Sequence, residues 1–179
     1  MANTERIKKD IETLRTITQP CEEGTTRLSY TPAYRQAVNY LTEEMVRYGI
    51  VPREDNIGML YGSVPGTDPK APHILSGSHL DTVRCSGAFD GQAGIICALE
   101  AARMLVENRV SLRSTYEVVA TIMEDGARFP SLGGSRLASG LLDDSYLDEA
   151  EDDDGVTLRQ ALKDYGLPGT LEGVSRSGE

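Results

Sequence analysis

Basic charge, cysteine and long apolar runs are all scarce in this sequence. It holds 18 Lys and Arg against 28 Asp and Glu, and the net charge of −10 disfavours nucleic acid and anionic membranes as partners. The longest apolar run, residues 94–99, is too short to span a bilayer, and the first residues lack the apolar core of a signal peptide. Cys21, Cys85 and Cys97 form no Cys-x-x-Cys pair, which favours free thiols in a reducing cytoplasm.

The apolar pattern alternates between strand-like and helix-like periods, which predicts a layered α/β fold. With 179 residues, 39% of them apolar, the chain is long enough for one domain with a real core. We expect helices at 4–17, 32–48, 91–107, 135–140 and 157–166, and strands at 50–55, 57–64, 73–80 and 115–123. The strand at 115–123 is largely apolar, which is typical of a central strand.

Residues 141–154 form an acidic segment with eight Asp and Glu and no Lys or Arg. We interpret it as a solvated acidic connector. A cation-binding loop is the alternative, although the regular spacing of a calcium loop is absent.

Only two histidines occur in the chain, and one of them stands beside carboxylates in the stretch "SGSHLDTVRCSGAFDG", residues 76–91. His79 and Asp81 are two apart on a predicted strand, so both point to the same side, where one can ligate a metal and the other can orient the imidazole. Asp90 follows a loop that contains glycine and immediately precedes the helix predicted at 91–107. The carboxyl ends of strands in an α/β sheet are the usual place for such a site.

A second predicted strand ends in "MEDGARFP", which brings Glu124 and Asp125 to the same edge of the sheet. One imidazole with several carboxylates suits zinc or manganese. The alternative is a histidine and an aspartate that share a hydrogen bond and hold no metal.

Other polar and reactive residues have simpler interpretations. His73, at the start of its strand, is expected to be structural or exposed. Cys85 lies between His79 and Asp90, and without a second histidine nearby to activate it we interpret it as an incidental thiol. Arg128 and Arg136 can either contact a substrate carboxylate or lie on the solvated surface.

The segments "GSHLDTV", "GAFDG" and "ALE", at residues 77–83, 87–91 and 98–100, closely resemble a known metal-binding signature. It is that of the allantoate amidohydrolase and N-carbamoyl-L-amino-acid hydrolase family, within the dinuclear zinc carboxypeptidases and aminoacylases. "GTTRLSYTP", "DNIGMLYGSVPGTDP" and "DDDGVTLRQALKDYGL" agree as well, so the resemblance covers almost the whole chain.

The resemblance implies hydrolysis of a linear amide or ureido C–N bond in a small molecule, with two divalent metal ions, zinc or manganese. It also implies a layered α/β/α catalytic domain, a separate lid or dimerisation domain, and a homodimer. Allantoate is the favoured substrate because of "RFP" and "TRLSYTP", and an N-carbamoyl-L-amino acid is the alternative.

Carried over by motif position, the resemblance also implies roles for individual residues. His79 is expected to ligate one metal, Asp90 to bridge both, and Asp81 to orient His79. Glu124 falls on the ligand of the other metal and Met123 on the general base. Because a thioether cannot titrate, Asp125 is considered as a surrogate base.

Enzymes of this family are about twice as long and take two further histidine ligands from later sequence. We therefore expect residues 1–179 to be the N-terminal portion of a catalytic domain, truncated and without its lid. The missing ligands would come from a partner chain or a lost segment. A non-catalytic relic or regulatory module of the same fold is the alternative, which Met123 favours.

Overall fold

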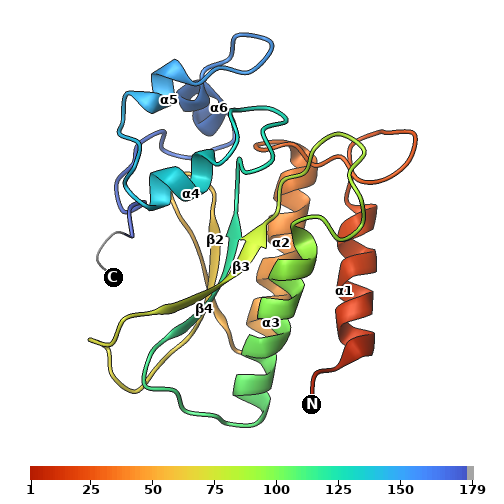
Figure 1. The fold of residues 1–179 in the computed structure, drawn as a ribbon, viewed down its shortest axis with the longest axis vertical. Helices are drawn as coiled ribbons and strands as arrows, with labels where there is room; N and C mark the ends of the chain where they lie inside the picture. Colours follow the sequence, from red (N-terminus) through yellow and green to blue (C-terminus); the bar gives the residue numbers. More distant parts are fainter. Residues whose placement is uncertain (177–179) are drawn as a thin grey trace.

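A four-stranded mixed sheet organises the computed structural model, which describes residues 1–176 (Figure 1). Its order is β1-β2-β4-β3, and its strands are β1 (Val51–Glu54), β2 (Leu60–Val64), β3 (Ile74–His79) and β4 (Tyr116–Thr121). β4 pairs antiparallel with β2 and parallel with β3. The apolar strand predicted to be central is indeed flanked by a strand on each side, and its residues 117–120 are buried.

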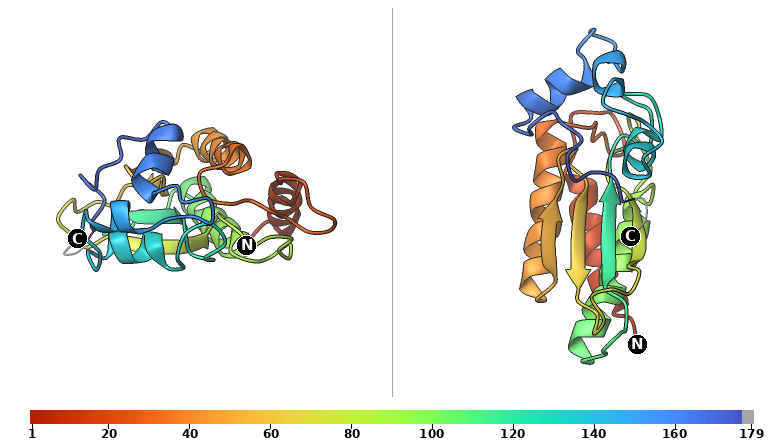
Figure 2. Two further views of the ribbon diagram at one scale, coloured as in Figure 1. Left: turned by 90° about the horizontal axis from the view of Figure 1, so that it is seen from above. Right: turned by 90° about the vertical axis from the view of Figure 1, so that its left-hand side faces the viewer.

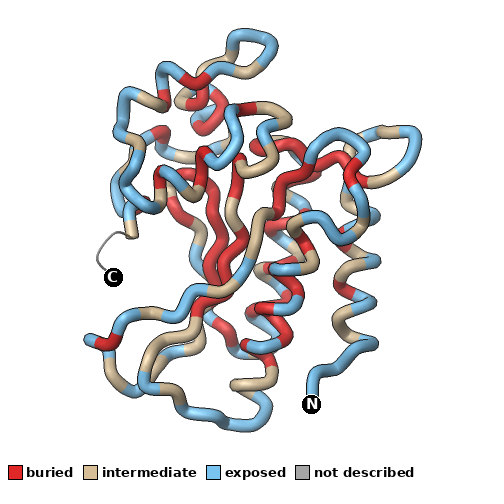
Figure 3. Tube along the Cα trace, in the orientation of Figure 1, coloured by how far each residue is buried: buried red, intermediate tan, exposed pale blue. Residues whose placement is uncertain are grey.

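Three long helices accompany the sheet: α1 (Thr4–Thr16), α2 (Pro32–Arg47) and α3 (Gln92–Glu107). α2 and α3 pack on one face of the sheet, and α1 packs on α3 (Figures 1 and 2). The contact with α2 is close because Gly62 has no side chain: a Cβ there would lie 2.6 Å from Met45 Sδ. Val118 and Ala120, on the same sheet face, are fully buried. Buried segments run along the middle of the sheet (Figure 3).

The opposite face of the sheet is covered more thinly. It meets α4 (Gly133–Ala138) and the segment that ends at Arg176, which stacks over the ring of Tyr61. A cleft of about 350 Å³ remains there, bordered by Tyr61, Val119 and Leu75. The predicted α/β layering is confirmed. On the second face of the sheet, the helical layer within the described residues consists of α4.

The acidic segment is more ordered than a solvated connector. It contains the short helix α5 (Tyr146–Glu149), whose Leu147 is fully buried, and it leads to α6 (Leu158–Asp164). Arg159 of α6 forms ion pairs with Asp144 and Asp148. The acidic side chains of 141–154 therefore also hold a local helical unit together. None of the helices within residues 1–176 combines the length and the hydropathy needed to cross a bilayer.

Candidate metal centre

His79 is the last residue of β3 and pairs with Thr121 at the end of β4. Its ring Nδ1 lies 2.8 Å from the main-chain oxygen of Asp81. A carbonyl oxygen can only accept, so Nδ1 carries the hydrogen, and Nε2 is left to face the other side. This hydrogen bond sets the tautomer that a histidine needs to ligate a metal through Nε2.

Two carboxylates face Nε2 of His79. Its distance to Asp90 Oδ1 is 3.6 Å and to Asp125 Oδ1 is 3.8 Å. The candidate ligand atoms of these three residues lie within 4.8 Å of one another. We call His79, Asp90 and Asp125 the metal cluster.

Each aspartate of the metal cluster is held by one further hydrogen bond. The Ser86 hydroxyl donates to Asp90 Oδ2 at 2.8 Å, and the Val83 N–H donates to Asp125 Oδ2 at 2.9 Å. Both donors come from the loop that follows β3. That loop therefore fixes one oxygen of each carboxylate and leaves the other facing the histidine.

Asp81 lies beneath the metal cluster and is almost completely buried. Its carboxylate accepts the N–H groups of Glu124 and Asp125, at 3.1 Å and 3.3 Å. Burial raises the pKa of Asp81 to about 6, while these N–H donors and His79 act in the opposite direction. Asp81 thus contacts His79 through its main-chain oxygen, and its carboxylate positions the turn that carries Asp125.

Met123 and Glu124 lie outside the metal cluster. Met123 has a positive φ of 59° and is buried, with its sulfur 3.4 Å from the Tyr30 hydroxyl, which donates to it. The Glu124 carboxylate accepts from the N–H and the hydroxyl of Ser135, at 2.7 Å and 2.9 Å. The resemblance implies that Glu124 ligates a metal and that Met123 stands at the general base, whereas in the structure it is Asp125 that faces His79.

The reason for this difference is local. β4 ends at Thr121, and the left-handed conformation of Met123 breaks the strand alternation before the acidic residues are reached. The alternation of side chains along a strand therefore does not tell which face of the sheet a residue after Thr121 points to.

Sequence reasoning missed two residues that shape the metal cluster, Ser86 and Gly91. Gly91 has φ of 62°, and a Cβ there would lie 2.5 Å from Nδ1 of His79. The glycine directly after Asp90 was visible in the sequence, but only the close approach of the imidazole shows why it is needed.

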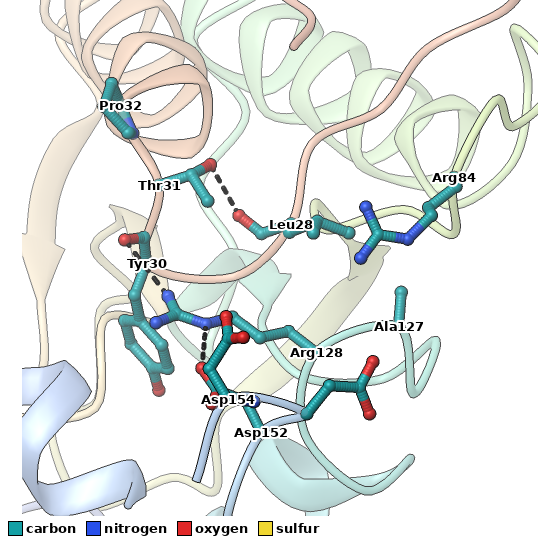
Figure 4. A pocket seen from close by; sticks show the side chains of 10 residues that line it. Leu28, Tyr30, Thr31, Pro32, Arg84, Ala127, Arg128, Asp152 and Asp154 are labelled. Carbon is teal, nitrogen blue, oxygen red and sulfur yellow. Dashed lines mark hydrogen bonds and ion pairs between the residues drawn. The ribbon is translucent and has the colours of Figure 1, made fainter. Parts of the chain in front are cut away.

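A polar cavity of about 340 Å³ opens beside the loops that follow Asp81 and Asp125 (Figure 4). Arg84 reaches over its rim, and Asp152, Asp153 and Asp154 line it. Arg128 is engaged there: it pairs with Asp152 at 3.1 Å and donates to the carbonyl of Ser29 at 2.9 Å.

The remaining sequence candidates lie elsewhere. His73 Nδ1 lies 3.0 Å from Glu117, which also pairs with Arg176 on the thinly covered sheet face, so His73 joins a structural network. Arg136 is exposed on α4.

The donor set of the metal cluster fits a divalent ion. One imidazole nitrogen and two carboxylate oxygens are the ligands that zinc and manganese accept. Ligands about 2 Å from a shared zinc ion lie up to roughly 4 Å apart, so the observed spread of 4.8 Å requires only small side-chain rotations.

Comparison with known proteins finds relatives along nearly the whole chain, although no family profile matches it. It is 44% identical over 178 residues to the N-carbamoyl-L-amino-acid amidohydrolase of Paenarthrobacter aurescens, covering 98% of this chain and 43% of that protein. It is 34% identical to the allantoate amidohydrolase of Bacillus subtilis strain 168, covering 80% of this chain and 35% of that protein. The chain thus spans about two fifths of the length of these relatives.

Solved structures give the same result. A hydantoinase/carbamoylase family amidase from Burkholderia ambifaria superposes with a TM-score of 0.88 at 31% identity, covering 94% of this chain and 42% of that one. A second amidase of that family, from Burkholderia phymatum, gives 0.83 at 29% identity, covering 99% and 42%. The fold described above is therefore shared with part of each of these longer chains.

Proposed function

Because this chain belongs to the family of the N-carbamoyl-L-amino-acid and allantoate amidohydrolases, we propose that it supplies part of a metal-dependent active site. The reaction is hydrolysis of a linear amide or ureido C–N bond in a small molecule. The observation that carries the proposal is the metal cluster, in which the Nε2 of His79 faces Asp90 and Asp125.

In this proposal His79, Asp90 and Asp125 hold a divalent ion, zinc or manganese. The ion would supply Lewis acidity toward the carbonyl of the bond to be cleaved. We assign Asp90 as the carboxylate that two ions would share. Its side chain is 44% exposed, so a second ion could reach it from outside the metal cluster. Asp81 keeps the ligands in place from below, through its contacts with His79, Glu124 and Asp125.

The geometry favours an alignment of the family's acidic motif that is shifted by one residue. The two acidic positions of the site then fall on Glu124 and Asp125, and no longer on Met123 and Glu124. Asp125 then binds metal, and Glu124 is the group that takes and returns a proton once Ser135 releases it. A general base is typically worth about 10²–10⁴ in rate. Met123 has no part in this chemistry, which removes the sequence argument for a non-catalytic relic.

We propose that polypeptide outside these 179 residues completes the site. A catalytic zinc usually has three protein ligands, so the metal cluster suffices for one ion and a second ion requires more. The additional ligands would come from a continuation of the chain or from a partner chain, and we propose a cytoplasmic homodimer. The substrate class we propose is a ureido acid, either allantoate or an N-carbamoyl-L-amino acid.

Metal titration by calorimetry tests the ligand assignment on the chain itself. We expect weak zinc binding to the wild type, at least about tenfold weaker binding to Asp125→Asn, and unchanged binding to Glu124→Gln. Asp153→Asn, which changes an exposed aspartate outside the metal cluster, serves as the matched control. If Glu124→Gln abolished zinc binding and Asp125→Asn did not, the assignment of Asp125 as the metal ligand would be wrong.

A chimera tests the activity. Residues 1–179 would replace the matching stretch of the Paenarthrobacter aurescens enzyme, and ammonia release from an N-carbamoyl-L-amino acid and from allantoate would be followed. We expect a manganese-dependent activity that Glu124→Gln reduces by about 10²–10⁴ without loss of folding. A folded, metal-binding chimera that hydrolyses neither substrate would contradict the proposed activity while leaving the metal cluster standing.

A further inference from the structure

Two loops, residues 17–29 and 80–91, lie against each other beyond the carboxyl end of β3 (Figure 1). Thr25 and Ser86 form an isolated antiparallel bridge between them. The N–H of each donates to the carbonyl oxygen of the other, at 3.0 Å and 2.8 Å. The bridge keeps the first loop beside the segment that carries the metal ligand Asp90.

Cys85 is held directly against the first loop. Its N–H donates to Thr26 Oγ1 at 2.8 Å, and a Cβ on Gly24 would lie 2.8 Å from its carbonyl oxygen. Its φ of 53° is uncommon for a residue with a side chain, yet its side chain remains exposed.

Cys21 belongs to the first loop, which contacts the segment that carries Cys85. Its sulfur is 3.5 Å from the carbonyl oxygen of Gly24 and 3.8 Å from the hydroxyl of Thr18. The pKa of the Cys21 thiol is lowered chiefly by a hydrogen bond with Thr26, then by Thr18 and by the thiol of Cys85, while burial acts against them. Thr26 therefore has hydrogen bonds with both cysteines, which places Cys21 and Cys85 on adjoining segments.

We propose that Cys21 and Cys85 are a redox pair that forms a reversible disulfide bond with each other. The oxidant is a low-molecular-weight disulfide such as oxidised glutathione, which exchanges with the two thiols. The Cys21 thiolate attacks one sulfur of glutathione disulfide, which forms a mixed disulfide and releases one glutathione thiolate. The Cys85 thiolate then attacks the sulfur of Cys21, and the second glutathione leaves as a thiolate. Two protein thiols are oxidised and one small disulfide is reduced, so atoms and electrons balance.

The disulfide would tie the loop at 17–29 to the loop that orients Asp90 through Ser86. In a reducing compartment the pair stays open, and disulfides of cytosolic proteins are usually transient or redox-sensing. The third cysteine, Cys97, is exposed on α3 and provides the matched control.

Peptide mapping of the full chain tests the proposal. The protein is incubated with oxidised glutathione, alkylated without reduction, and digested with trypsin. We expect one cross-linked product joining residues 16–27 to residues 85–103, present equally in Cys97→Ser and lost after treatment with dithiothreitol. Cys85→Ser should instead leave Cys21 as a glutathione adduct, because the resolving thiol is then missing.

A second measurement follows how the disulfide restricts the loop at 80–91, through the rate of tryptic cleavage. Trypsin cleaves after the exposed Arg84, and the cross-link should slow this cleavage by about fivefold or more because the loop opens less often. Separate glutathione adducts on Cys21 and Cys85, disulfides involving Cys97, or a disulfide-linked dimer as the main product would each overturn the proposal.

Discussion

At the scale of single residues, Gly91 is a position where the backbone approaches the metal cluster closely. A Cβ there would lie 2.3 Å from the His79 carbonyl oxygen and 2.6 Å from Cε1 of its ring. Gly91→Ala should displace the imidazole and weaken zinc binding by about tenfold or more. Gly87→Ala, in the same loop, is the control because a Cβ there meets nothing within 4 Å. Equal zinc affinities of the two variants, measured by calorimetry, would contradict this account.

Asp55 gives the chain a pH-dependent stability. Burial raises its pKa to about 6 from 3.8, although N–H groups of Met59 and Ile57 donate to its carboxylate and lower it. The folded state therefore favours the protonated form. The stability that this provides is complete below the unfolded pKa of 3.8 and is lost as the pH rises through about 6.

Replacement of Asp55 tests this sign. Asp55→Asn stays neutral at every pH and keeps an oxygen that can accept from both N–H groups. We expect the wild type to lose up to about 3 kcal/mol relative to Asp55→Asn between roughly pH 4 and pH 7. Urea denaturation at several pH values measures the difference, with Asp153→Asn as an exposed control. A constant difference across that range would count against the assignment.

At the scale of secondary-structure elements, Arg103 joins α1, α2 and α3. Its buried guanidinium on α3 forms ion pairs with Asp10 of α1 and Glu44 of α2. Arg103→Met should cost about 3–5 kcal/mol, because two buried carboxylates lose their partner. Arg15→Met, at an exposed side chain of α1, is the control. Thermal and urea denaturation provide the measurement, and a loss under about 1 kcal/mol would mean that the network is replaceable.

The elements also show how far the sequence could predict this fold. The helices at 4–17, 32–48 and 91–107 were predictable because apolar residues recur with a helical period. The helix α5 could not be predicted, since its four residues lie in an acidic segment and are stabilised by contacts outside the helix, the burial of Leu147 and the ion pair of Asp148 with Arg159.

The candidate site was predictable only in part. His79 and Asp90 could be anticipated from their positions at a strand end and a helix start. The acidic pair could not, because the positive φ of Met123 turns the chain and sends Glu124 to Ser135 while Asp125 reaches His79. At this turn Met123 is buried and its sulfur accepts from the Tyr30 hydroxyl, a contact between segments far apart in sequence that no local pattern predicts.

At the scale of the whole molecule, the sheet has an open edge. Within the described residues, β3 is hydrogen-bonded in the sheet to β4 alone, and its Ile74 and Leu75 are 46% and 47% exposed. Unpaired strand edges with apolar side chains invite association. We expect the 179-residue chain to self-associate with rising concentration, more strongly at high salt where the charge of −10 is screened.

Light scattering on purified protein tests this expectation. Leu75→Lys should reduce association by placing a charge at the open edge, whereas Val46→Lys, at an exposed position on α2, should not. A monodisperse monomer at high concentration that binds no apolar dye would show that these residues close their own core.

The central claim is that His79, Asp90 and Asp125 share one metal ion. Anomalous diffraction at the zinc absorption edge, from crystals of this chain grown with zinc, tests it most directly. We predict a peak about 2 Å from Nε2 of His79 and from one oxygen each of Asp90 and Asp125, with Glu124 still bonded to Ser135. A zinc ion coordinated by Glu124 in place of Asp125, or bound only at the acidic segment 141–154, would contradict the account.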